Sequence, residues 1–407
     1  MYQLYSTYKI QKDKYNTNAI QDPISFILSQ GKKGVKNTRL LQLIDKETRL
    51  FESTDYSKLH KKLINSKQAK DLNKLNLDTA LARENERMES FIAQKDFDFS
   101  ESYYQFRIPK ATGGFRTITA PLKDLKREQS LQKEFIEDIL HLLPHNAAHG
   151  YVKERSTTTN AMTHKESKHF VKIDMKAFFP SITSEMLLEV LPKIGIFGFA
   201  QLEKTEFTII NDFSFQMKRY IKNIIELSTL NGELPQGTPI SPLLSNLVLI
   251  PFDHAMYELF KEEKRSIIYT RYADDTEYSS LTKLNAKWLE ESIDRVFEKV
   301  YSKKYISINY KKTRTSTNCG KNRITGIKVN AENELSVGWK EKRALKLSIM
   351  NLIIKRLSGE PIPPYTQDIL GYLNYLNGVE PDYAQYLIKK LQNKFKIEHL
   401  QKFLNTY

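Results

Sequence analysis

The sequence predicts an α+β fold with strands in its central part and helices at both ends. Two observations support this prediction: β-branched and aromatic runs bounded by turn residues between about residues 101 and 330, and helical periodicity before and after them. No apolar run approaches the roughly 20 residues that a membrane helix needs. The first residues also lack the apolar core of a signal peptide. We therefore expect a cytoplasmic protein without a membrane partner.

The composition indicates a folded protein with an acidic partner. The chain has 407 residues, of which 40% are hydrophobic and 11% aromatic, and this is typical of folded domains. Its net charge of +15 favours a polyanion, with nucleic acid as the first candidate. An anionic membrane surface is the rival, but no compact polybasic tail adjoins an apolar helix. The single cysteine, Cys319, excludes an internal disulfide and a zinc cluster.

The predicted elements follow from local pattern and turn residues. Two strands, 103–108 and 115–119, flank a Gly113-Gly114 turn. The other predicted strands are 170–174, a hairpin over 266–280, and short strands near 306 and 324. The predicted helices are 38–50, 59–91, 122–143, 214–227, 242–259, 286–300, and a series from 339 to the end that breaks at 361–364. Pro381 is predicted to open the last helix.

Carboxylates at the ends of two predicted strands suggest a metal site. The strand 170–174 ends in Asp174, and the run 266–270 leads to adjacent Asp274 and Asp275. Adjacent carboxylates repel each other unless a cation lies beside them. Mg²⁺ prefers a few carboxylates plus substrate phosphates, and two such ions about 3.5–4 Å apart can clamp both oxygens of a phosphoryl transfer. The alternative is a turn in which the aspartates accept backbone hydrogen bonds.

Three segments occur in an order that resembles reverse transcriptases. Asp174 with Phe178-Phe179-Pro180-Ser181-Ile182 resembles motif A, Gln236 to Pro242 resembles motif B, and Tyr272-Ala273-Asp274-Asp275 resembles motif C. The resemblance covers about residues 101–330 and includes the segments 108–116, 149–161, 309–313 and 324–327. It implies a right-hand polymerase with fingers and a palm with an antiparallel sheet over 101–335, and a helical thumb over 336–407. A helical N-terminal extension over 1–100 would precede them.

The resemblance also implies roles for individual residues. Asp174, Asp274 and Asp275 would be catalytic and hold two Mg²⁺ ions, with Mn²⁺ as the alternative ion and Asp275 the least directly engaged. The implied nucleotide-binding residues are Lys110, Arg116, Phe178, Phe179, Gln236, Gly237 and Lys312.

Each of these assignments has an alternative. Lys110 and Arg116, which would grip the triphosphate, can instead be solvated surface charges. Phe179, which would stack under the sugar and favour dNTPs, can instead be a core residue. Lys312, which would lie near the leaving pyrophosphate, competes with its neighbour Lys311.

Two further segments resemble bacterial retron enzymes or related defence-associated reverse transcriptases of the unknown-group or abortive-infection type. The Asn160-Ala161-x-x-His164 segment resembles a retron signature, and Ile324-Thr325-Gly326 resembles their Val-Thr-Gly. Asn160 and His164 are therefore expected to bind nucleic acid, and the alternative for His164 is a histidine on a helix surface. Glu277 departs from the apolar residues more usual after the Asp-Asp pair, and either pairs with a basic residue or adds an acid near the metals.

Basic residues in the presumed thumb predict a grip on nucleic acid. They are Lys340, Lys342, Arg343 and Lys346, and the alternative is a solvated helix face. The resemblance implies an RNA-directed DNA polymerase that copies a structured noncoding RNA, as template and primer, into cDNA from dNTPs in antiphage defence. Homo-oligomerisation stays open. The alternatives are template-independent or repetitive DNA synthesis by the same site, and an RNA-binding scaffold that keeps a polymerase fold.

Overall fold

The computed structural model describes residues 67–95, 99–110, 113–139, 144–192, 215–319, 322–361 and 366–405. Two compact units make up the chain. The first comprises Met1–Asn146 and Phe179–Pro251, and the second comprises Ala147–Phe178 and Phe252–Tyr407. The predicted helix at 38–50 and the beginning of the one at 59–91 lie outside the described residues.

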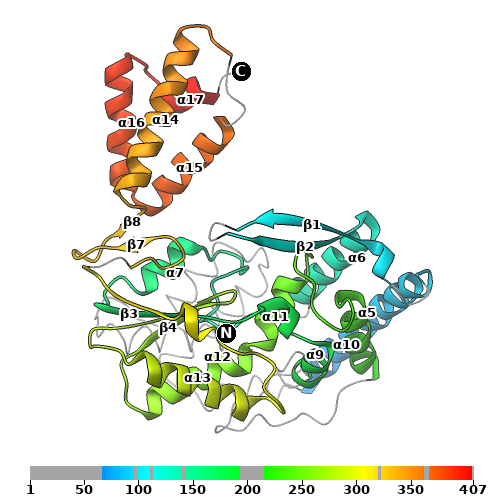
Figure 1. Ribbon diagram of the computed structural model, residues 1–407. Coiled ribbons are helices and arrows are strands. Elements are labelled where there is room, and N and C mark those ends of the chain that lie inside the picture. Colours follow the sequence, from blue (N-terminus) through cyan, green and yellow to red (C-terminus); the bar gives the residue numbers. More distant parts are fainter. Residues whose placement is uncertain are drawn as a thin grey trace. The chain divides into compact units, whose positions relative to one another are not determined.

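Helices and one β-hairpin form the first unit. Helix α5 (Lys67–Ala93), blue in Figure 1, packs against α10 (Phe215–Ser228), which also contacts α6 (Lys123–Glu134). Helix α10 buries residues spaced three and four apart, which is the pattern of an amphipathic helix. The α5–α10 contact is polar as well: the Asn85 Nδ2 donates to the Gln216 carbonyl oxygen at 2.8 Å, and the Asn223 Nδ2 donates to the Asn85 Oδ1 at 3.1 Å.

The hairpin predicted over 103–119 is confirmed. Strands β1 (Tyr103–Pro109) and β2 (Phe115–Pro121) are antiparallel, and Pro109 pairs with Phe115 at the turn. The helix predicted at 122–143 is α-helical only over α6. It continues as a π-helical turn, Phe135–Ile139, and residues 140–143 lie outside the described part.

Proline divides the helix predicted at 242–259. The structure has α11 (Ser241–Val248) and α12 (Ile250–Glu262) in its place. Pro251 has no backbone N–H to donate to the preceding turn, so the α11 hydrogen-bond ladder cannot run through it. Helix α9 (Ser184–Val190), which also belongs to the first unit, is capped by Thr183, whose Oγ1 accepts a hydrogen bond from the Met186 N–H at 3.3 Å.

The second unit is built on an antiparallel sheet with the strand order β4-β5-β3-β6. Its strands are β3 (His169–Asp174), β4 (Ile268–Tyr272), β5 (Asp275–Ser280) and β6 (Arg314–Thr317). The predicted strand at 170–174 and the predicted hairpin at 266–280 are thus confirmed, and so is the α+β class with an antiparallel sheet.

Helices cover both faces of this sheet. Helix α13 (Ala286–Val300) and α12 lie on one side and α7 (Thr157–Thr163) on the other (Figure 1). Aromatic rings fill the α12–α13 side: the Phe252 and Phe297 centroids are 4.2 Å apart, and the Phe260 ring meets Tyr278 edge to face. The opposite face carries the charged residues of β3 and β5, because side chains alternate along a strand.

The structure has no strand at residue 306 or 324, where short strands were predicted; the nearest strands begin at Arg314 and Lys328. Ile308 makes only an isolated bridge with Met175, and a 3-10 turn, Tyr310–Lys312, precedes β6. Ile324 bridges Ile327 just before the small hairpin of β7 (Lys328–Val329) and β8 (Leu335–Ser336). Burial explains the apolar pattern at these positions, since Ile308 and Ile324 pack into the core without extended pairing.

The C-terminal part is helical, as predicted. It comprises α14 (Trp339–Leu357), α15 (Thr366–Val379), α16 (Pro381–Phe395) and α17 (Leu400–Asn405). Pro381 is the first residue of a helix, as predicted, but that helix, α16, is not the last one. Lys396, with φ +53°, ends α16, and α17 follows. Among the described helices, none has the length and apolar character to cross a membrane.

Candidate active site

The three predicted catalytic aspartates meet at one end of the sheet. Asp174 is the last residue of β3 and pairs with Asp275, the first residue of β5. The Met175 N–H donates to the Asp274 carbonyl oxygen at 3.0 Å, which ties the segment after β3 to the β4–β5 turn. Strand pairing therefore brings together carboxylates that are 100 residues apart in the sequence.

Buried contacts brace the turn that carries Asp274. Ala273 has φ +58°, and its carbonyl oxygen accepts from the Arg271 Nη1 at 3.3 Å. Arg271 pairs with Asp253 at 2.8 Å, and both side chains are fully buried. Burial lowers the pKa of Arg271, but Asp253 more than offsets this, so the pKa is raised and the guanidinium stays charged. Gly150 lies so close that a Cβ there would be 2.7 Å from the Ala273 nitrogen.

Lys312 reaches the first aspartate. Its Nζ lies 3.0 Å from Oδ2 and 3.3 Å from Oδ1 of Asp174. The Asn309 N–H donates to the Asp174 carbonyl oxygen at 2.7 Å and places the 3-10 turn that holds the lysine. Of the two lysines weighed from the sequence, Lys312 is therefore the one beside the carboxylates. Its role at the pyrophosphate stays a prediction.

Lys172 and Glu277 lie behind the aspartates and extend the charged face. The Lys172 Nζ is 2.5 Å from Asp275 Oδ2 and 3.8 Å from Glu277 Oε1. Burial lowers the pKa of Lys172, but Asp275 and Glu277 outweigh this and raise it. Burial raises the pKa of Glu277 to about 8, and the positive charge of Lys172 only partly offsets this effect. The predicted pairing of Glu277 with a basic residue is confirmed.

The sequence interpretation overlooked Lys172, although a signal was present. Lys172 precedes Asp174 by two residues on a strand, so alternation puts both side chains on one face. The same spacing relates Asp275 and Glu277 on β5.

The predicted metal ligands do not form a complete metal site by themselves. Within the described residues no group of three or more His, Cys, Asp or Glu side chains is arranged to hold a metal. Asp174 has 13% of its side chain exposed, so its carboxylate lies at the edge of the protein interior. Mg²⁺ uses few protein carboxylates where substrate phosphates complete its shell. The metal-ligand set stays a prediction.

The predicted phosphate-gripping residues lie beside the turn of the β1–β2 hairpin. Lys110 and Arg116 are both exposed there. The Lys110 N–H donates to the Gly114 carbonyl oxygen at 2.9 Å, and Gly113 and Gly114 have φ +90° and +77°. Glycine is suited to this turn because other residues rarely adopt positive φ. Whether the two cations bind a triphosphate stays a prediction.

The motif B loop lies against the same hairpin in the first unit. The Thr119 N–H donates to the Gln236 carbonyl oxygen at 2.8 Å. Gly237 has φ +125°, and a Cβ there would lie 2.6 Å from the Ile118 Cγ2. The neighbouring Thr238 accepts the Ser241 N–H at 3.1 Å at the start of α11. Glycine at position 237 is therefore required by conformation and by space.

Phe178 and Phe179 lie in a short helical turn, α8 (Phe178–Ser181), and are mostly buried. Their exposed fractions are 4% and 8%. Ala177, with φ +46°, turns the chain into this segment. Such burial is compatible with a ring that packs under a sugar and also with core packing, so both interpretations of Phe179 remain.

His164 is a core residue, which corrects both sequence interpretations. It is fully buried, its Nδ1 lies 2.6 Å from the Ser279 Oγ, and its Nε2 lies 2.6 Å from the Thr270 Oγ1. A histidine enclosed by two strands is neither on a helix surface nor presented to a nucleic acid. Asn160 is also fully buried, and its Nδ2 is 3.5 Å from the Thr325 Oγ1. The two retron-like segments therefore adjoin each other.

The predicted thumb cations differ in their surroundings. Lys340 and Arg343 are exposed, and the Arg343 guanidinium carbon lies 5.3 Å from the Trp339 ring centroid. Lys342 pairs with Glu380, and its Nζ is 4.4 Å from the Tyr383 ring centroid. Its ammonium is therefore engaged by residues at the start of α16. Lys346 is partly exposed. Nucleic-acid binding by these residues stays a prediction.

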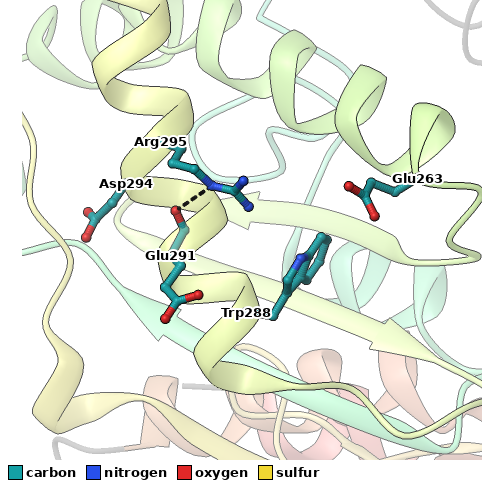
Figure 2. A pocket seen from close by; sticks show the side chains of 5 residues that line it. All are labelled: Glu263, Trp288, Glu291, Asp294 and Arg295. Atoms are coloured by element: carbon teal, nitrogen blue, oxygen red, sulfur yellow. Dashed lines mark hydrogen bonds between the residues drawn. The ribbon is translucent and has the colours of Figure 1, made fainter.

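A hollow of about 610 Å³ is lined by residues of α13 and by the residue that follows α12. Figure 2 shows its lining: Glu263, Trp288, Glu291, Asp294 and Arg295. The Arg295 Nε donates to the Glu291 carbonyl oxygen at 3.4 Å. None of the predicted site residues lines this hollow.

Comparison with known proteins identifies the family. Residues 108–355 match the family described as reverse transcriptase (RNA-dependent DNA polymerase). The chain therefore belongs to this family, and it is an RNA-directed DNA polymerase.

Its relatives place it beside the retron enzymes of bacteria. It is 28% identical to the retron Ec83 reverse transcriptase of Escherichia coli, over 73% of this chain and 91% of that protein. It is 30% identical to the retron Ec73 reverse transcriptase of E. coli, over 71% and 87%, and 29% identical to the retron Mx162 reverse transcriptase of Myxococcus xanthus, over 70% and 59%. The predicted resemblance to a retron-like reverse transcriptase is confirmed.

Among solved structures, apo telomerase from Candida tropicalis matches with a TM-score of 0.41 at 13% identity, covering 77% of this chain and 63% of that one. Telomerase from Candida albicans with a fragment of telomeric RNA matches with a TM-score of 0.39 at 13% identity, covering 78% and 62%.

Proposed function

We propose that this reverse transcriptase copies a structured noncoding RNA into cDNA by two-metal phosphoryl transfer, in bacterial antiphage defence. The observation that supports it most is the meeting of Asp174 and Asp274 at one end of the antiparallel sheet. The dNTPs are its substrates and the cytoplasm its place of action. Residues 101–335 act as fingers and palm, 336–407 as thumb, and 1–100 as an extension.

Asp174 and Asp274 would hold the ions, and Asp275 would complete the acidic edge. Bound Mg²⁺ would activate the primer hydroxyl and neutralise charge on the phosphates. The residues of the chain would position these ions: strand pairing fixes the aspartates, and the buried Arg271–Asp253 pair braces the β4–β5 turn that carries Asp274. Lys312, with 61% of its side chain exposed, supplies positive charge beside the leaving pyrophosphate.

Recognition of the RNA is assigned to the helical C-terminal part. The exposed Lys340 and Arg343 and the neighbouring Trp339 ring offer phosphate contacts and a surface for stacking. Binding should therefore weaken steeply as salt rises. The names of the retron relatives support an RNA partner and a DNA product.

Primer extension tests the proposal directly. The protein is given an RNA template, a DNA primer, dNTPs and Mg²⁺, and Asp274→Ala is compared with Glu332→Ala, which removes an exposed acid from a turn. We expect Asp274→Ala to lower the rate at least about a hundredfold and Glu332→Ala to leave it unchanged. Extension that survives Asp274→Ala would disprove the site. Product that forms without template would favour untemplated synthesis.

The scaffold alternative makes an opposite prediction in cells. If DNA synthesis is required, the double variant Asp274→Ala, Asp275→Ala loses protection against phage while it still binds RNA. Full protection by that variant would favour a binding role. RNA pulled down with the variant serves as the control for folding.

Phe179 tests the choice of sugar. We expect Phe179→Val to raise the incorporation of ribonucleotides relative to dNTPs by about tenfold or more, because the smaller side chain makes room for a 2′-hydroxyl. An unchanged ratio, with reduced stability, would assign Phe179 to core packing.

A further inference from the structure

The face of the sheet behind the catalytic edge carries two successive cross-strand pairs of charged residues. Asp174 pairs with Asp275, and Lys172 pairs with Glu277. Residues directly opposite each other in antiparallel strands project to the same face, as do residues two apart on one strand. One lysine and three acids therefore share this face.

The short contact of Lys172 is with Asp275, its diagonal neighbour on β5, and not with Glu277, the residue directly opposite it. Its Nζ is 2.5 Å from Asp275 Oδ2 and 3.8 Å from Glu277 Oε1. The Glu277 side chain is 3% exposed, while those of Lys172 and Asp275 are 31% and 29% exposed. The ammonium thus lies between a deep acid and an acid at the catalytic edge.

We propose that Lys172 is a positioning residue that holds Asp275 away from the metals and leaves Asp174 and Asp274 as the ligand pair. An Asp275 oxygen that accepts an ammonium hydrogen bond at 2.5 Å from the partly buried Lys172 has less charge to give to a cation. The Lys312 ammonium beside Asp174 lies farther away, at 3.0 Å, and its side chain is 61% exposed, so water can replace that contact. The buried Glu277 lies on the other side of the ammonium, with its Oε1 3.8 Å from the Lys172 Nζ. This inference rests on the proposed metal site.

The geometry also explains why this arrangement needs a lysine. A compact ammonium on a long stem can reach a neighbouring pair on the same face, whereas a planar guanidinium prefers to engage one carboxylate with two parallel bonds. Lys168, which precedes the same strand and is exposed, offers a matched control because it carries the same charge outside this cluster.

Metal binding without turnover tests the proposal. The full chain is bound to an RNA template, a dideoxy-terminated primer and the matching dNTP, and Mn²⁺ is titrated by electron paramagnetic resonance. We expect Lys172→Met to tighten Mn²⁺ binding by about five- to tenfold, since it releases Asp275 to act as a further ligand. Lys168→Met should stay within about twofold of wild type.

A double-mutant cycle separates positioning from simple bracing. In an Asp275→Asn background, adding Lys172→Met should change Mn²⁺ binding by less than about twofold, because the lysine then no longer holds a carboxylate at the catalytic edge. Asp275→Asn alone should weaken Mn²⁺ binding by no more than about threefold, whereas Asp174→Asn should abolish it. The variant Lys172→Met, Glu277→Met removes the lysine together with the buried acid beside it and keeps the test valid if Lys172→Met does not fold.

The outcomes are distinct. Unchanged Mn²⁺ binding in Lys172→Met and in the double variant would overturn the positioning role while the metal site stands. A shift that persists in the Asp275→Asn background would overturn it too. If Asp174→Asn does not weaken Mn²⁺ binding, the proposed metal site is wrong and the inference falls with it.

Discussion

Gly150→Ala should damage the catalytic turn through a single added methyl group. A Cβ at this position would be 2.7 Å from the Ala273 nitrogen and 3.2 Å from the Tyr272 carbonyl carbon. Ordinary contacts begin about 0.7 Å further away, and the opposing atoms are backbone atoms that cannot rotate aside. Something in the turn before Asp274 must therefore move.

The expected cost has a structural and a catalytic part. Overpacking of this kind destabilises by about 1–3 kcal/mol, and each kcal/mol lowers the Tm by about 2–4 °C in a unit of this size. A displacement of about 1 Å at the Asp274 turn would lower the rate about a hundredfold.

Primer extension and thermal unfolding measure these two effects together. Gly371→Ala is the matched control, because Gly371 lies within α15 and an added Cβ meets nothing within 4 Å. This control should be as stable as wild type or more so, by up to about 1 kcal/mol, since alanine favours helix. A Gly150→Ala protein with wild-type rate and Tm would refute the reasoning.

Three other predictions concern particular contacts. Gly237→Ala should lower the Tm and the extension rate, since its Cβ would collide with Ile118 at 2.6 Å and φ is +125°; unchanged values would show that the loop can move. Burial lowers the pKa of His149 to about 3, with a smaller contribution from the positive charge of Arg155. The contribution of the neutral imidazole to the free energy of unfolding should therefore be full above about pH 6.5, and about 2 kcal/mol of it should be lost at pH 5. His149→Gln should remove this part of the pH dependence in denaturant unfolding, and an identical slope would contradict it. Arg271→Leu should cost about 3–5 kcal/mol by leaving Asp253 buried without its partner, and Asp253→Leu added to it should recover part of the loss; additive losses would argue against the pairing.

Local rules predicted the parts of the fold that local chemistry determines. The hairpin around Gly113, the strand that ends at Asp174 and the helix that begins at residue 286 follow from alternation, turn residues and 3.6-residue periodicity. The division of the helix near residue 250 could also have been predicted, because Pro251 lacks an N–H. The apolar residues on both sides of Pro251 instead favoured the prediction of one continuous helix.

Long-range packing explains the remaining differences. Nothing near His164 in the sequence indicates that Ser279 and Thr270, more than 100 residues away, enclose its ring. Gly150 is a similar case. Glycine is required there because the Ala273 backbone leaves no space for a Cβ, and not because of the backbone angle of Gly150 itself. The aspartates were found because each lies at or next to a strand end, whereas the position of Lys172 beside Asp275 follows only from the pairing of β3 with β5.

The most direct test of the proposed function uses the native complex. The protein is purified from its own locus with the RNA that it carries, given dNTPs and Mg²⁺, and both the RNA and the product are sequenced, with Asp274→Ala in parallel. The account predicts a cDNA complementary to one co-purified noncoding RNA, made by the wild type and not by the variant. A homopolymer, a random sequence or no DNA at all from the wild type would contradict it.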